Sequence, residues 1–325
     1  NLTVTLPLHF VGAGISSTVV DGAEAGRVFN ITNARGGVSF TDLTVRNGHI
    51  AAGDGGGIYA AGALTLTNAA VTGSSTGSGS GGGIYVRGPL TLANAEVMSN
   101  TAGSTGIVFG GGIYAVSAVH ATGGTLQNNL ADTTALNANA YGGGLYASAT
   151  AALTGTRFVG NIARTYNTGG GAYGAQALGG GVYANGALTV EAGEFLSNTA
   201  KSGAGASYAS TYAFGGGVFA GGPATFHDGL FEGNGANPFL PYTGTTATGS
   251  GYGYGGGLYG RDTLAISGTR FVGNNVDRGL GGTATNDYRK FTANGGGLDA
   301  GSSLTMDSAE FSGNSGLYTG MGYGA

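Results

Sequence analysis

The sequence predicts an all-β protein: a parallel β-solenoid (β-helix) of about ten coils, each with three short strands. Two observations lead to this prediction. A triple glycine followed by an aliphatic residue recurs eight times, and a 20-residue unit with a constant apolar pattern begins at each one. Units of this size that stack on their neighbours are typical of solenoids. The triple glycines begin at positions 55, 81, 110, 142, 179, 215, 255 and 295.

The three strands follow from the alternation inside the unit. Counted from the first glycine, aliphatic residues stand at +3, an apolar pair at +9 and +11, and an aliphatic residue or Phe at +16. Alternation with period two indicates a strand with one buried face. Helical repeats would need amphipathic stretches of about 10–15 residues, and the sequence has none. All length variation lies in the insert after each unit, which we expect on one side of the solenoid.

The glycines are expected at a sharp corner of each coil. Equivalent residues of neighbouring coils stack at about 4.8 Å, so side chains at a tight corner would collide with their own copies. Glycine removes that crowding and permits positive φ. The small residue at +5, mostly Ala, is expected to fill the narrow corner inside.

The last position of the unit is expected to form a buried polar ladder. Stacked side-chain amides can bond to one another and to the turn backbone, which satisfies groups that burial would leave without partners. The first coil has Ser74 at this position. The other seven residues are Asn100, Asn129, Asn161, Asn198, Asn234, Asn274 and Asn314.

Composition narrows the function classes. The chain has 325 residues, 72 of them Gly, no Cys or Trp, and a net charge of −4. Gly without a strict third-residue period excludes collagen, and 41% apolar residues is too many for simple disorder. The 12 Lys and Arg are scattered, which argues against a nucleic-acid partner. No apolar run approaches the roughly 18 residues of a membrane helix, so no direct membrane span is expected.

The repeats carry a resemblance. A triple glycine with Ile, Leu or Val, followed by Phe-x-x-Asn as in Phe158 to Asn161 and Phe195 to Asn198, resembles the paired GGA[I/L/V] and FxxN repeats of the polymorphic outer membrane proteins. It also resembles the wider group of bacterial right-handed parallel β-helix surface proteins, and it covers nearly the whole chain. The resemblance implies a right-handed helix and a bacterial, secreted or cell-surface location.

An enzyme is the less favoured class. Right-handed β-helices include pectate lyases and polygalacturonases, but glycoside hydrolysis needs two carboxylates at a fixed separation, and lyases need a calcium site and a strong base. The 16 acidic residues are spread thinly. Arg157 with Glu194, and Arg270 with Glu310, fall at +15 on adjacent coils and predict surface ion pairs. We expect no catalytic residues, no metal and no cofactor.

The aromatic residues give the candidate binding site. A Tyr or Phe stands at +4 in seven units, between two inward positions, so the rings should form an outward column. Further tyrosines lie in the inserts. Either the inserts fold back and bury the rings as a second core, which Phe109 and Tyr141 before the glycines would assist, or the rings are a platform for sugars. The candidate ligand-binding residues are Tyr59, Tyr85, Tyr114, Tyr166, Tyr208 and Tyr252.

The expected organisation is one domain over 1–325, with two coils in 1–54 and eight glycine coils in 55–325. The chain lacks a starting Met and shows no polar capping repeat at either end, so we expect a segment of a longer solenoid or head-to-tail stacking with itself into a filament. The predicted function is an extracellular structural or adhesive element. The alternatives are a carbohydrate-binding adhesin with surface glycans as partners, and a polysaccharide-cleaving enzyme.

Overall fold

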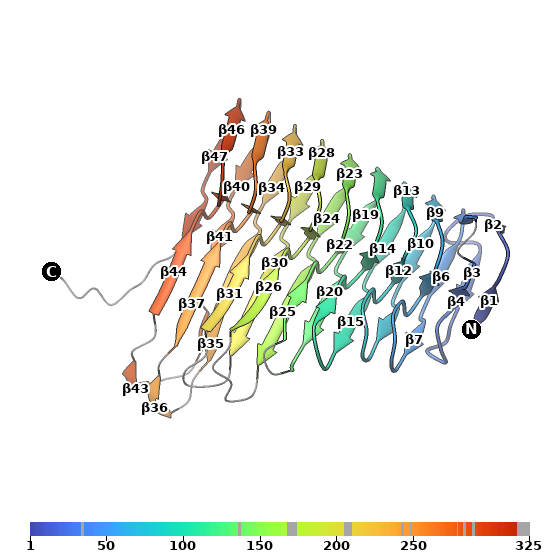
Figure 1. The fold of residues 1–325 in the computed structure, drawn as a ribbon, viewed down its shortest axis with the longest axis horizontal. Helices are drawn as coiled ribbons and strands as arrows, with labels where there is room; N and C mark the ends of the chain where they lie inside the picture. Colours follow the sequence, from blue (N-terminus) through green and yellow to red (C-terminus); the bar gives the residue numbers. More distant parts are fainter. Residues whose placement is uncertain are drawn as a thin grey trace.

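The described part of the chain is built from β-strands and turns. All of its paired strands are parallel, and the coils lie side by side along the long axis (Figure 1). Among these residues no helix is long and apolar enough to cross a bilayer. The structure, a computed structural model, describes residues 1–33, 36–135, 138–167, 174–204, 210–241, 244–247, 249–277, 279–281, 284–287 and 290–316.

Three sheets of ten strands each enclose the main core, so the predicted solenoid of about ten three-strand coils is confirmed. Sheet A contains β1 (Leu2–Val4), β4 (Phe29–Ile31), β8 (Ile58–Ala60), β12 (Ile84–Val86), β17 (Ile113–Ala115), β22 (Leu145–Ala147), β27 (Val182–Ala184), β32 (Val218–Ala220), β38 (Leu258–Gly260) and β45 (Leu298–Ala300). Sheet B contains β2 (His9–Val11), β5 (Val38–Thr41), β9 (Leu64–Thr67), β13 (Leu90–Ala93), β18 (Val119–Thr122), β23 (Ala151–Thr154), β28 (Leu188–Glu191), β33 (Ala224–His227), β39 (Leu264–Ser267) and β46 (Leu304–Asp307). Sheet C contains β3 (Val19–Asp21), β6 (Thr44–Arg46), β10 (Ala70–Thr72), β14 (Glu96–Met98), β19 (Thr125–Gln127), β24 (Arg157–Val159), β29 (Glu194–Leu196), β34 (Leu230–Glu232), β40 (Arg270–Val272) and β47 (Glu310–Ser312).

The inserts add two further long sheets and a small one beside the solenoid. Sheet D contains β7 (His49–Ile50), β11 (Ser75–Thr76), β15 (Thr101–Ser104), β20 (Leu130–Thr133), β25 (Ile162–Asn167), β30 (Thr199–Ala204), β35 (Gly235–Pro241), β41 (Asn275–Val276) and β48 (Ser315–Gly316), with β42 (Gly279–Gly281) paired to β35. Sheet E contains β16 (Val108–Phe109), β21 (Ala140–Tyr141), β26 (Ala175–Leu178), β31 (Ser210–Phe214), β37 (Ser250–Tyr254) and β44 (Lys290–Asn294). The small sheet pairs β36 (Gly244–Ala247) with β43 (Ala284–Asp287).

The main core holds the residues that the repeat pattern predicted. Ile58 at +3, Ala60 at +5 and Leu66 at +11 are all fully buried. At +16 the Phe rings stack along the axis, with centroids 5.2 Å apart from Phe158 to Phe195 and 4.6 Å apart from Phe195 to Phe231. Stacking at the coil spacing lets each ring contact its copies above and below.

Each of the three corner positions requires glycine for a different reason. The first, such as Gly81 with φ +63°, has the left-handed backbone that side chains disfavour. At the second, Gly82, a Cβ would collide with the backbone of Thr101 and Gly111. At the third, Gly83, a Cβ would lie 2.8 Å from Cγ of Asn100. The predicted crowded corner is confirmed.

The asparagine ladder is confirmed and fully hydrogen-bonded in its middle. Asn100 is fully buried, and its Nδ2 donates to Oδ1 of Asn129 at 3.0 Å and to the carbonyl of Val71 at 3.0 Å. The backbone N–H of Asn100 also donates to Oδ1 of Asn129 at 3.1 Å. Asn129 repeats this pattern towards Asn161. Each amide therefore ties three coils together.

Sheets D and E face each other and form what we call the fin. The strands of sheet D lengthen from β7 to β35: β7 and β11 have two residues, β25 and β30 six, and β35 seven. The space between the two sheets is filled by small side chains, which lets the sheets approach closely. Two buried apolar clusters lie in the fin: Ala102, Val108, Ala131, Ala140 and Ala163, and further along Ala177, Ala200, Ala213, Ala236 and Val276.

Candidate functional site

The outward face of sheet A carries a continuous column of aromatic rings. Because these residues stand between two inward positions of short strands, each ring projects away from the core. They pair in register from coil to coil, and successive centroids lie 4.8–5.3 Å apart. The column consists of Tyr59, Tyr85, Tyr114, Tyr146, Tyr183, Phe219 and Tyr259.

A second row of large side chains comes from sheet E. Its residues stand directly before the triple glycine, so each strand of sheet E turns through the corner into a strand of sheet A. The two rows meet there: ring centroids lie 4.8 Å apart for Phe109 and Tyr146, and 5.1 Å apart for Tyr141 and Tyr183. The second row consists of Phe109, Tyr141, Leu178, Phe214 and Tyr254.

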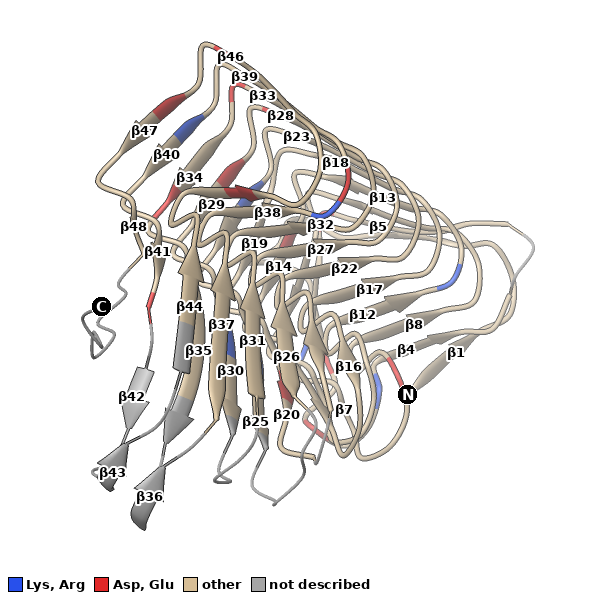
Figure 2. Cartoon of the chain, turned by 60° about the vertical axis from the view of Figure 1, so that its left-hand side comes forward, with Lys and Arg blue, Asp and Glu red and all other residues tan. Residues whose placement is uncertain are grey.

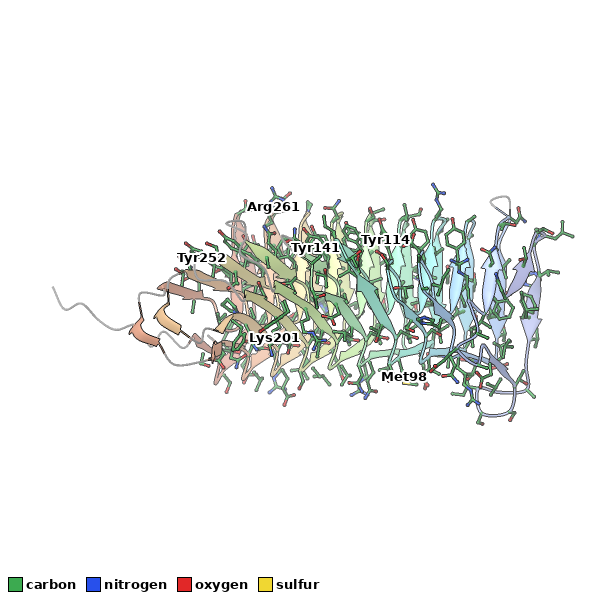
Figure 3. All side chains as sticks on the ribbon, turned by 90° about the horizontal axis from the view of Figure 1, so that it is seen from below. Met98, Tyr114, Tyr141, Lys201, Tyr252 and Arg261 are labelled. Atoms are coloured by element: carbon green, nitrogen blue, oxygen red, sulfur yellow. The ribbon has the colours of Figure 1, made fainter. Side chains whose placement is uncertain are left out.

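An open groove runs in the angle between these two rows. It has a volume of about 380 Å³ in its central part. Figure 2 shows the strands of sheet E standing across those of sheet A, mostly without charged residues, whereas charges mark β40 and β47 of sheet C. In Figure 3, Tyr114, Tyr141 and Arg261 lie on one side of the molecule and Lys201 and Met98 on the other. The groove is lined by Tyr141, Gln176, Leu178, Tyr183, Tyr212, Phe214, Phe219, Tyr259 and Arg261.

Charged groups mark the two ends of the aromatic column. At the first ring, the guanidinium of Arg27 lies 5.2 Å from the centroid of Tyr59, a cation–π contact. Its Nε and Nη2 donate to the carbonyls of Gly55 at 2.9 Å and Asp54 at 2.7 Å, which hold it over the ring. In the last coil Asp299 stands in register with Tyr259, and burial raises the pKa of that carboxyl.

The phenols of the groove are held in the neutral form. Burial raises the pKa of Tyr146, with a smaller contribution from the neighbouring Tyr183. It likewise raises the pKa of Tyr141 and Tyr183. At neutral pH each phenol is an O–H group that can donate and accept hydrogen bonds, and each ring is partly exposed. Rings of the column stack on one another, as Tyr183 does on Tyr146 and Phe219, so the surface they offer is a continuous strip of partly exposed apolar ring with phenol O–H groups.

The residues predicted as ligand-binding lie on different faces of the molecule and do not form one site. Tyr59, Tyr85 and Tyr114 lie in the column of sheet A, and Tyr252 lies on the outer part of sheet E, where its centroid is 4.9 Å from that of Tyr212. Tyr166 lies on the outer face of sheet D, on the other side of the fin. Tyr208 is outside the described residues.

The expected second core forms in part among the described residues. The aromatic residues before the triple glycines pack on the column, as Phe109 does on Tyr146, and Phe219 is buried. The tyrosines of the column keep an intermediate exposure, and the space between sheets D and E is filled mainly by alanine. The second row, which includes Tyr141 and Phe214, was not among the predicted ligand-binding residues. The sequence feature that could have identified this second row is the large side chain that directly precedes most of the triple glycines.

Acidic and metal-binding groups are sparse. In the part of the chain that the structure describes, no three His, Cys, Asp or Glu residues lie together as a metal site would require. The predicted surface ion pairs are confirmed, with Nε of Arg157 2.8 Å from Oε2 of Glu194 and Nε of Arg270 2.9 Å from Oε2 of Glu310. Exposed pairs of this kind contribute little to stability.

Comparisons with protein-family models, with curated proteins and with solved structures find no match to this chain.

Proposed function

We propose that this chain is a non-enzymatic, extracellular rod that binds an extended neutral polysaccharide along the aromatic groove. The observation that carries the proposal is the regular, nearly uncharged double row of rings. The apolar face of a pyranose ring packs on an aromatic face, while its hydroxyls bond to polar groups at the edge. Tyr183 and Tyr259, which line the groove, offer partly exposed ring surface and a phenol O–H.

The repeat of the scaffold supports a polymeric ligand. One ring of sheet A recurs in each coil, about every 4.8 Å, so the same contact is offered many times along one axis. Linked weak contacts add up to useful avidity. The column stands on short strands fixed by the core and the Asn ladder, so little ordering entropy is lost on binding.

The absence of catalysis and the location are part of the same proposal. Among its described lining residues the groove contains no Asp or Glu, and glycoside hydrolysis uses a pair of them. The similarity of the repeats to those of the polymorphic outer membrane proteins supports a secreted or cell-surface place in a bacterium.

The test is binding of the full chain to a panel of neutral polysaccharides. We expect Tyr183→Ala combined with Tyr259→Ala to lower retention at least tenfold, because both rings line the groove and their contacts with the sugar are lost. The matched control is Tyr166→Ala, the same substitution on the other side of the fin, with retention unchanged. Equal loss in both variants, or release of reducing ends from any polysaccharide, contradicts the proposal.

A second candidate, end-to-end assembly into a filament, is favoured by one observation. In the last described coil, core residues of the sheets are exposed: Met306 is 47% and Phe311 46% exposed, whereas Phe271 one coil earlier is fully buried. A further coil, from a second copy or from a longer chain, would cover them and pair the open strand edges.

The filament proposal is tested by electron microscopy and light scattering. Met306→Lys places a charge on this surface and should suppress axial growth. Thr305→Lys on the same strand, which points away from the core, is the control. A monomer at all concentrations for the unmodified chain overturns self-assembly.

A further inference from the structure

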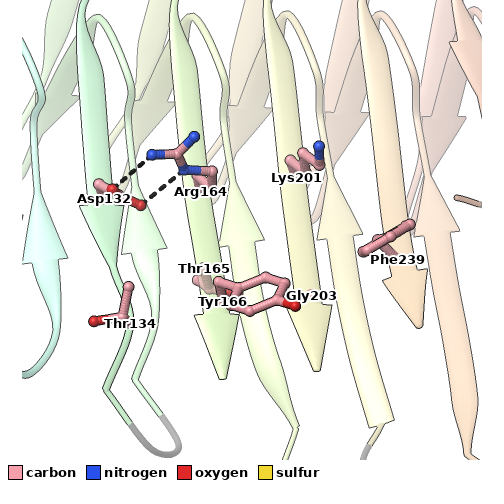
Figure 4. Close-up of a pocket in the computed structure, with 8 residues that line it drawn as sticks. All are labelled: Asp132, Thr134, Arg164, Thr165, Tyr166, Lys201, Gly203 and Phe239. Atoms are coloured by element: carbon pink, nitrogen blue, oxygen red, sulfur yellow. Dashed lines mark hydrogen bonds and ion pairs between the residues drawn. The ribbon is translucent and has the colours of Figure 1, made fainter. Parts of the chain in front are cut away.

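A second, chemically different pocket lies on the outer face of sheet D. It has a volume of about 310 Å³, and it lies on the side of the fin away from the aromatic groove, as the position of Lys201 indicates (Figure 3). Two rows of side chains form it (Figure 4). One row consists of Asp132, Arg164 and Lys201, and the other of Tyr166, Gly203 and Phe239.

The first row has an excess of positive charge. Arg164 Nη2 and Nε bind the two carboxylate oxygens of Asp132 at 2.7 Å and 2.9 Å, which fixes the guanidinium plane. Lys201 is exposed in the next coil, and among the described residues it has no acidic partner. One carboxylate and two cations leave a single positive charge, in a chain whose net charge is −4.

In the second row the ring of Tyr166 forms the floor of a shallow slot, and Phe239 stands at its border. Tyr166, Gly203 and Phe239 are in register on three adjacent strands. Because Gly203 has no side chain, the ring of Tyr166 lies across it; an added Cβ would be 3.0 Å from Cδ2 of that ring. Tyr166 is 39% exposed, so one face of its ring is open to a ligand.

The two rows are two residues apart along their strands, or about 6.6 Å. The carboxylate oxygens of a hexuronate lie about 3.5 Å from the ring centre, and a charge-assisted hydrogen bond of about 2.8 Å from a cation brings the total close to this separation. The ammonium of Lys201 lies 5.6 Å from the centroid of Phe239, so the cation and the slot belong to one pocket.

We propose that this pocket binds an acidic sugar residue, a pyranose with one carboxylate such as a hexuronate. The sugar ring packs on the open face of Tyr166 above Gly203, and its carboxylate lies between Arg164 and Lys201. A singly charged carboxylate matches the single excess charge of the row better than a dianionic phosphate. The site does not depend on the groove, because none of its residues lines the groove.

The test is titration of the full chain with methyl glucuronide, followed by saturation-transfer NMR and calorimetry. The comparison ligands are methyl glucoside, which is the uncharged analogue, and inorganic phosphate. We expect binding of the glucuronide only, with the sugar ring protons receiving saturation from aromatic residues. Rising salt should weaken it, because exposed charges are screened.

Two variants locate the site. Lys201→Met keeps the aliphatic stem and removes the charge, and Tyr166→Ala removes the stacking face; each should weaken glucuronide binding at least tenfold with the melting temperature unchanged. Tyr183→Ala in the groove should leave it unaltered. Equal binding of glucoside and glucuronide, preference for phosphate, no binding of glucuronide, or no effect of either variant overturns the proposal. Both monosaccharides are compared in the Tyr183→Ala background, so that sugar binding in the groove does not enter the comparison.

Discussion

The solenoid core and the fin are two regions built by opposite rules. The core comes from units of constant length and is filled by large side chains such as Phe195 and Leu66. The fin comes from inserts of variable length and is filled mainly by alanine. Both consist of parallel strands in register, so regular stacking at the coil spacing requires neither large side chains nor equal lengths.

The difference between the core and the fin shows which part of a repeat can change in length. In sheet D, strands β15, β20, β25, β30, β35, β41 and β48 each start just after an Asn of the ladder. Each strand of sheet E ends just before a triple glycine; Thr101 pairs with Leu130, and Phe109 with Tyr141. The register of an insert is thereby fixed at both of its ends. With both ends in register, the described strands of an insert can lengthen, as β25, β30 and β35 do, while the core stays the same.

The largest effect should come from the core. Phe195→Ala removes a fully buried ring that stacks on Phe158 and Phe231, and it should lower the free energy of unfolding by about 3–5 kcal/mol. Urea denaturation followed by circular dichroism measures it. The exposed Phe311→Ala at +16 of the last coil is the control, with a much smaller loss. Equal losses would contradict the packing argument.

The Asn ladder comes next. In Asn198→Leu the carbonyl of Phe158 and Oδ1 of Asn234 lose a donor, and the amide of Asn161 loses its acceptor. Buried groups left without partners cost about 1–3 kcal/mol. Thermal melting measures the effect against Asn185→Leu, an exposed Asn of the same coil. If Asn198→Leu leaves the melting temperature unchanged, the Asn ladder does not contribute to the stability of the fold.

The fin should respond less and locally. Ala200→Leu overfills the narrow space between sheets D and E, and we expect a cost of about 1 kcal/mol, at the low end for overpacking, because the outer edge of the fin can yield. Hydrogen exchange should show lost protection in β30 and β31 but not in β27 to β29. Loss of protection in all of these strands would mean that fin and core unfold as one unit.

The smallest effect on stability should come from the tyrosines of the aromatic column, which lie between the core and the fin. Burial raises the pKa of Tyr146 and Tyr183 above their value of about 10 in the unfolded chain. The neutral phenols therefore contribute stability that is complete below pH 10 and is lost as pH rises through the raised pKa. Ultraviolet titration should show tyrosinate forming later in the folded chain than in guanidinium. Coincident curves would contradict the burial of these phenols.

The positions of the candidate site could be predicted only in part. The outward column of Tyr59, Tyr85 and Tyr114 follows from alternation within a short strand. The second row does not, because it depends on how sheet E meets sheet A at the corner. Tyr166 and Tyr252 have the same residue type in similar inserts, yet they lie on different faces, since one precedes and the other follows the outer turn of the fin.

By itself the sequence determined the ten coils, the three strands in each, the glycine corner and the Asn ladder. These features rest on contacts between equivalent positions of neighbouring repeats, so a spacing that is the same in every unit, such as Gly142 to Asn161 and Gly179 to Asn198, reports them directly. The tertiary structure alone decided the fin, the groove and the pocket at Lys201. Alanine and glycine at alternate positions of an insert have too little apolar surface to indicate a buried face in the sequence, and which faces meet is set by the packing of sheet D on sheet E.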